Sequence, residues 1–203
     1  MSVVTRWRYA RSAEEIAAGT GPPVAFAVSP LHRRITATAH TQQFTSVNDG
    51  SLIARVRHKS GAYHPYAGMV FAVLEAKRSI DNRTQPQQAG EALAAMQERV
   101  RHLAALSQRS IAAQISATTP SMLSMFVVSL EQSHICFSRA QFPREYLRWV
   151  MGESPNTSEP AAFLSGEPWD LATTAGRRGA VAVALGLLAV VEREWGKFCE
   201  KVE

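Results

Sequence analysis

A carboxylate and an ammonium group stand two residues apart at the end of a long apolar run. Glu75 and Lys77 follow the run 69–74, whose β-branched and aromatic residues predict a strand buried on both faces. Side chains alternate along a strand, so Glu75 and Lys77 should point to the same face. Unpaired charges are costly to bury, so the two groups should be paired, hydrated or bound to a metal.

A second carboxylate could join this pair. Asp49 precedes the alternating segment 52–58, which predicts another strand. If the two strands are neighbours, Asp49 and Glu75 converge at one edge of the sheet. Two carboxylates make a hard oxygen site suited to Mg²⁺, which polarises a phosphodiester and lowers the pKa of a bound water. Lys77 would hold or help deprotonate that water and offset charge on the phosphorus. The alternative is that Asn-Asp-Gly at 48–50 is a plain hairpin turn.

The elements that must position these residues predict an α/β (α+β) fold, a mixed central β-sheet flanked by helices. The expected order is a helix opened by a capping box at 12–15, strands within 24–28, 35–47, 52–58 and 69–77, a long helix from Pro86, a hairpin of 122–130 with 134–138, a short helix at 143–151, an irregular excursion at 152–175 and a last helix at 176–200. The chain 1–203 is expected to form a single domain.

Two apolar patterns place the helices. Leu93, Met96, Val100, Leu103 and Ile111 recur at near-helical spacing and should face the sheet. The run Ala180 to Val191 is very apolar, but it is too short for a bilayer, which needs ~20 residues. It therefore predicts a buried helix and no membrane partner.

Composition and charge indicate a soluble globular protein with a moderately basic surface. Of 203 residues, 46% are hydrophobic and 19% are charged, and the formal net charge is +5. This excess fits a polyanionic partner, and Arg55, Arg57, Lys59 and Arg78 are the candidates for binding nucleic acid. With only two cysteines and a polar N-terminal stretch, we expect an intracellular protein, nuclear or cytoplasmic, with reduced thiols.

The pattern resembles the PD-(D/E)XK nuclease superfamily, which has the restriction-endonuclease-like fold. Its mark is an Asp after or within one strand and Glu-x-Lys on the next, followed by a helix; Asp49, Glu75 and Lys77 match these positions. Many members add a Gln on the following helix. Gln88 matches it best, and Gln85 and Gln87 are weaker candidates.

The resemblance covers residues 10–150 and is closest to nuclease-like proteins of fungi, which share the apolar strand into Glu-x-Lys-Arg, the Gln-rich helix start and the hairpin that follows. Asn48 stands where the superfamily usually has Pro. In some members a Glu on the first helix lies near the metal, and Glu14 or Glu15 could match it, although helix-dipole and capping stabilisation is the better explanation of both.

The resemblance implies a Mg²⁺- or Mn²⁺-dependent phosphodiesterase acting on nucleic acid, with DNA as the expected substrate. Asp49 and Glu75 would bind the metal, Lys77 would position the water and Gln88 would assist. One alternative is an inactive nuclease-fold module that binds nucleic acid or a protein, with a homodimer among the options. Another is a protein-interaction role that uses the excursion at 152–175 as its contact surface.

Overall fold

The computed structural model describes residues 24–29, 33–57, 63–77, 84–156 and 159–199. Its elements are β1 (Val24–Ser29), β2 (Arg33–Ala39), β3 (Gln42–Asn48), β4 (Gly50–Arg57), β5 (Tyr63–Lys77), α2 (Thr84–Leu106), α3 (Ile111–Ala117), the 3-10 helix η1 (Pro120–Met122), β6 (Ser124–Glu131), β7 (His134–Gln141), α4 (Arg144–Val150), β8 (Ala162–Ser165), β9 (Trp169–Asp170) and α5 (Thr174–Cys199). The expected helix at 12–15 lies outside the described residues.

The central sheet is mixed. Its strand order is β1-β4-β5-β6-β7-β8, and β9 also pairs with β7. The β5–β6 pair is parallel, with Ala72 opposite Phe126, whereas the other pairs in this sheet are antiparallel. The chain crosses from β5 to β6 through α2, α3 and η1, as parallel neighbours require. The predicted α/β architecture with a mixed sheet is therefore confirmed.

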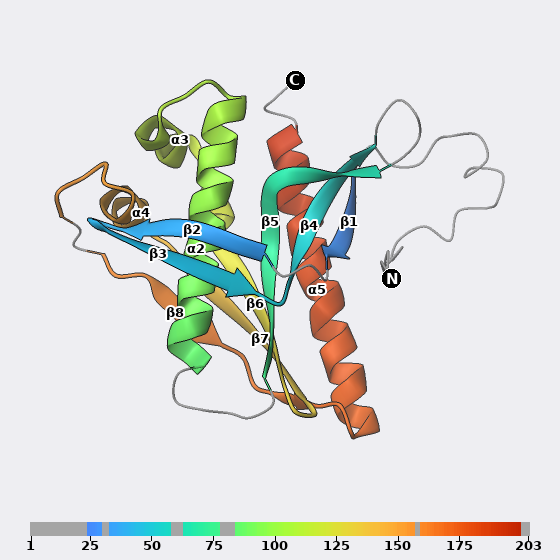
Figure 1. Ribbon diagram of the computed structural model, residues 1–203. Coiled ribbons are helices and arrows are strands. Elements are labelled where there is room, and N and C mark those ends of the chain that lie inside the picture. The colour runs from blue at the N-terminus through green and yellow to red at the C-terminus, as the bar shows by residue number, and fades with distance from the viewer. Residues whose placement is uncertain (1–23, 30–32, 58–62, 78–83, 157–158, 200–203) are drawn as a thin grey trace.

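Helices cover both faces of the sheet, with α2 on one face and α5 on the other (Figure 1). The α2 side is the larger core, in which Met96 and Val100 pack with Val70, Val73 and Val127. Each such apolar side chain contributes roughly 1.5–3 kcal/mol when fully buried. The predicted sheet-facing pattern of α2 is thus confirmed, although the chain leaves the helix at Leu106.

The long helix is shorter than its pattern predicted. Ile111 begins the separate helix α3, and Gln108 between the two helices has a left-handed φ of 52°. Ser110 caps α3 by accepting a hydrogen bond from the Ala113 N–H. This cap fixes a new helix start, which apolar spacing alone does not reveal.

Arg99 of α2 ties the helix to the two parallel strands. Its buried guanidinium donates to the carbonyl oxygens of Val70, Met122 and Ser124, and it lies 5.2 Å from the centre of the Phe71 ring. Val70 lies in the middle of β5, Met122 ends η1 and Ser124 begins β6. The arginine therefore fixes α2, and all that it carries, against β5.

The strands β3 and β4 do not form the hairpin that Asn-Asp-Gly at 48–50 suggested. Strand β3 pairs with β2 in a separate two-stranded sheet, and β4 pairs with β1 and β5. Gly50 is needed for close approach, because a Cβ there would lie 2.8 Å from the Ser29 carbonyl oxygen. The short sequence at 48–50 therefore marks the point where the chain passes from one sheet to the other.

The C-terminal region corrects two further expectations. The excursion at 152–175 contains the short strands β8 and β9, which extend the sheet beyond β7. Helix α5 packs through Leu187, Leu188 and Val191, but Val181 and Leu185 are exposed, so it is not the buried helix predicted from its apolar run.

That apolar stretch is also longer than the sequence pattern suggested. By length and composition, Thr174–Arg193 could cross a membrane, with a mean hydropathy of 1.5, and 17% of the stretch is buried. The core helices of soluble proteins meet the same criterion.

Candidate functional site

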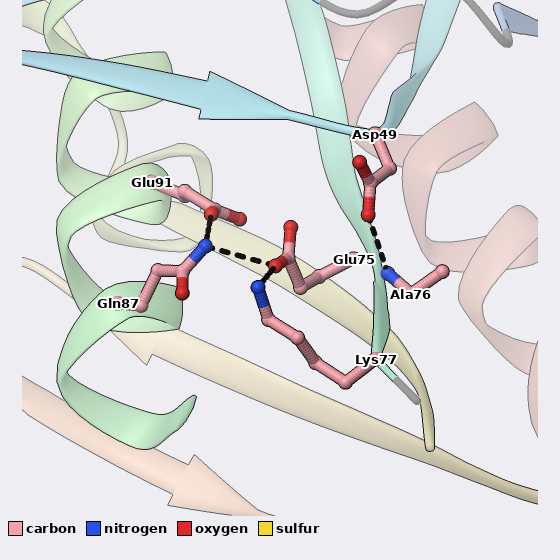
Figure 2. Close-up of polar contacts among 6 residues, drawn as sticks. All are labelled: Asp49, Glu75, Ala76, Lys77, Gln87 and Glu91. Atoms are coloured by element: carbon pink, nitrogen blue, oxygen red, sulfur yellow. Dashed lines mark hydrogen bonds and ion pairs between the residues drawn. The ribbon is translucent and has the colours of Figure 1, made fainter. Parts of the chain in front are cut away.

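Glu75 and Lys77 form an ion pair at the end of β5. The Lys77 ammonium contacts Oε1 of Glu75, as alternation along the strand predicted (Figure 2). Glu75 is 3% exposed, whereas the Lys77 side chain is partly open to solvent. The hydrogen bond to Glu75 raises the pKa of Lys77 above its usual value. Lys77 is therefore a charged donor at neutral pH, which suits it to stabilising negative charge more than to removing a proton.

Asp49, the residue just before β4, contacts the same end of β5. Its N–H donates to the Leu74 carbonyl over 3.0 Å, and its Oδ2 accepts from the Ala76 N–H over 2.8 Å. Asp49 thus extends the β4–β5 ladder by one residue beyond the start of β4. The expectation that the two strands are neighbours is confirmed, and Asp49 and Glu75 come to adjacent positions of one strand end (Figure 2).

The helix following β5 brings a glutamine to Glu75, and that residue is Gln87. The Gln87 amide donates to Oε1 of Glu75 over 2.8 Å. Gln88, the position favoured from the sequence, is buried on the helix face that also carries Ala92 and Met96. The spacing correctly predicted that Gln88 faces the core. The residue that contacts Glu75, however, is the preceding one, Gln87.

Glu91 is a third carboxylate in this cluster, and sequence reasoning missed it. It lies one helical turn after Gln87, and the same amide nitrogen donates to its Oε1 over 2.9 Å. Glu91 is 2% exposed. Burial, with the charge of Glu75 as a further cause, raises its pKa from 4.5 to about 8, so it is mostly protonated at pH 7. The i, i+4 spacing from Gln87 was the only sequence signal for it.

The β2–β3 hairpin packs against α2 and helps bury this region. Thr38 N–H donates to Oε1 of Gln97 over 3.0 Å, and the Gln97 amide donates back to the Thr38 carbonyl oxygen. Farther along the hairpin, the Phe44 ring lies beside Gly90, next to Glu91. A segment remote in sequence therefore covers α2 beside Glu91.

The residues present fit a hard divalent cation in type, since they offer carboxylate oxygens. Oε2 of Glu75 and Oε2 of Glu91 are buried and accept no hydrogen bond from another described residue, but a hydrogen bond between the two carboxyl groups is among the causes that raise the pKa of Glu91. Within the described part of the chain, no group of three or more His, Cys, Asp or Glu residues could hold a metal ion. A site here would therefore draw on few protein carboxylates, as Mg²⁺ does when water and substrate phosphate complete its shell.

The predicted nucleic-acid contacts stay predictions. Lys59 and Arg78 lie outside the described residues, as do Glu14 and Glu15. Arg55 and Arg57 belong to β4, where only their backbone is described: Arg55 pairs with Pro65 and Arg57 with Tyr63.

Comparison with protein-family models, with curated proteins and with solved structures finds no match for this chain.

Proposed function

We propose that this chain has a restriction-endonuclease-like fold and is a metal-dependent phosphodiesterase acting on nucleic acid. One observation carries the proposal. Asp49, Glu75 and Lys77 meet at the end of β5, and the helix that follows adds Gln87. This is the order of elements and residue types that the nuclease resemblance implies, assembled from segments far apart in the sequence.

Each residue has a chemical task in this proposal. Asp49 and Glu75 would hold Mg²⁺ or Mn²⁺, which supplies polarisation of the phosphodiester and a bound water of lowered pKa. Lys77, whose pKa Glu75 raises further above neutrality, would donate to the attacking water or to a phosphate oxygen and offset developing negative charge. Gln87 would keep the Glu75 carboxylate in place.

The substrate class follows from charge. The formal net charge of +5 favours a polyanion, and binding should weaken as salt rises because counterions are released from the phosphates. We expect DNA to be cut with little sequence preference.

The test is cleavage of plasmid and of labelled DNA and RNA oligonucleotides with Mg²⁺, Mn²⁺ or EDTA. We expect metal-dependent cleavage that is lost in Glu75→Gln and Lys77→Ala. Glu145→Gln and Arg109→Ala are the matched controls, because each removes the same charge from an exposed side chain. Cleavage that survives both site substitutions would exclude this site as its source.

An inactive module that binds nucleic acid or a protein is the second candidate, and one observation favours it. Oδ2 of Asp49 is engaged by the Ala76 N–H, so this carboxylate has a role in joining the strands without any metal. DNA binding by filter retention, with no cleavage and no Mn²⁺ uptake in calorimetry, would favour the module over the enzyme.

A further inference from the structure

Helix α5 packs against the sheet with one side and leaves apolar side chains open to water on the other. Leu187 and Val191 pack against residues of β4 and β5, on the face of the sheet opposite α2 (Figure 1). On the uncovered side Val181 is 48% exposed and Leu185 is 42% exposed. Exposed apolar side chains that adjoin one another on a folded domain are typical of an interaction surface.

The uncovered side of α5 has the spacing of a helix-pairing seam. Arg178, Leu185 and Glu192 stand seven residues apart, so they lie on one line along the helix, as the residues of a heptad do. Small or β-branched apolar residues flank this line, namely Val181, Ala182 and Ala189. All six are exposed except Glu192, which is partly exposed. We call these six residues the α5 stripe.

The charges at the two ends of the α5 stripe make it complementary to itself. Arg178 and Glu192 lie on either side of Leu185, each about 10.5 Å from it along the helix axis. In an antiparallel pair with a two-fold axis at Leu185, Arg178 of each chain lies opposite Glu192 of the partner subunit. A parallel pair would instead place Arg178 against Arg178 and Glu192 against Glu192. The charge pattern therefore favours a second copy of this chain in the antiparallel orientation, in which the helix dipoles also attract.

A membrane is the other occupant to consider, because Thr174–Arg193 meets the length and composition of a spanning helix. Two observations speak against it. The start of α5 packs tightly on β9, since a Cβ on Gly179 would lie 2.2 Å from the Trp169 ring. The carboxylate of Glu192 within the stripe would also be costly to place in lipid. A protein surface that offers a cation at this position accommodates the stripe better.

We propose that the α5 stripe is a self-association surface, through which two copies of this chain pair antiparallel about a two-fold axis at Leu185. The inference goes beyond the proposed function and does not depend on it, because Glu75 contacts α2, on the other face of the sheet. The stripe is about 21 Å long from Arg178 to Glu192. A seam of this length is smaller than a standard interface of about 800 Å² per partner, so the dimer should dissociate on dilution.

The experiment measures the oligomeric state of the full chain by sedimentation velocity. EDTA is present, and the chain concentration runs from about 1 µM to 1 mM, which spans the affinities of small interfaces. The variants are Leu185→Gln, Arg178→Glu and Glu192→Arg, together with an equimolar mixture of the last two. The controls, at exposed positions outside α5, are Leu164→Gln, Arg109→Glu and Glu145→Arg. Circular dichroism and thermal unfolding verify that each variant is folded.

We expect a monomer–dimer equilibrium for wild-type chain and for the three controls. Leu185→Gln should weaken dimerisation at least about tenfold, because two copies of this side chain lose their apolar contact. Each single charge substitution should weaken it about tenfold, since two attractive pairs become repulsive. The equimolar mixture of Arg178→Glu and Glu192→Arg should dimerise like wild type, because every facing pair again has opposite charges. The two positions lie about 21 Å apart in one helix, so only contact between chains explains this rescue.

Three results would overturn the inference. The first is wild-type chain that stays monomeric throughout the concentration range. The second is a dimer that Leu185→Gln or the single charge substitutions leave intact, which would place the interface elsewhere or in another register. The third comes from flotation with vesicles of phosphatidylcholine and phosphatidylserine: binding of monomeric wild-type chain that Leu185→Gln abolishes would identify a membrane surface as the partner of α5.

Discussion

The buried carboxyl group of Glu91 should make the stability of this fold depend on pH in an unusual direction. Burial and the nearby charge of Glu75 raise its folded-state pKa from 4.5 to about 8. Between these values the folded chain keeps a proton that the unfolded chain releases, so the free energy of unfolding falls as pH rises. The stabilisation is complete below pH 4.5 and is lost as pH rises through 8.

The size of the effect follows from the same shift. Each pKa unit is worth about 1.4 kcal/mol, so the interval from 4.5 to about 8 sets a ceiling of roughly 5 kcal/mol. Glu91→Gln removes the ionisation but keeps an oxygen that can accept from Gln87. We expect the variant and wild-type chain to have similar stability near pH 5, and the variant to be more stable by several kcal/mol at pH 8.

Urea unfolding followed by tryptophan fluorescence at a series of pH values from 5 to 8 measures this difference. EDTA must be present, because a cation bound at the cluster would itself stabilise the folded state. The control is Glu145→Gln, which removes an exposed charge and should leave the slope with pH unchanged. Parallel curves for wild type and Glu91→Gln would refute the reasoning, since they would mean that Glu91 ionises equally in both states.

Three further outcomes test the surrounding structure. Gly50→Ala should destabilise the fold by roughly 1–3 kcal/mol, because its Cβ would lie 2.8 Å from the Ser29 carbonyl oxygen; an unchanged urea midpoint would contradict this close approach. Arg99→Met should lower the free energy of unfolding by roughly 2–4 kcal/mol, since three carbonyl oxygens lose their donor. An unchanged free energy of unfolding in the same urea assay would show that these hydrogen bonds do not stabilise the fold. Gln87→Ala should raise the pKa of Glu91 further, because the hydrogen bond from Gln87 lowers that pKa. Carbon-13 NMR titration of the Glu91 carboxyl group measures the change, and a lower pKa in the variant would exclude the contact.

The parts of the fold that could be predicted from the sequence are those fixed by local periodicity. The apolar run before Glu75 predicted a buried strand, and the spacing of Met96 and Val100 predicted the face of α2 that packs on it. Alternation also predicted that Glu75 and Lys77 share a face, which their ion pair confirms. In each case one regular repeat relates a residue to its neighbours.

What could not be predicted depends on contacts between remote segments. Asn-Asp-Gly at 48–50 has the local chemistry of a hairpin turn, but the partners of β4 are decided by burial against β1 and β5. Likewise, the sequence favoured Gln88 over Gln85 and Gln87, because local spacing does not give the rotation of α2 about its axis relative to β5. Arg99 holds that rotation through the carbonyl oxygens of the strands, and this places Gln87 at Glu75.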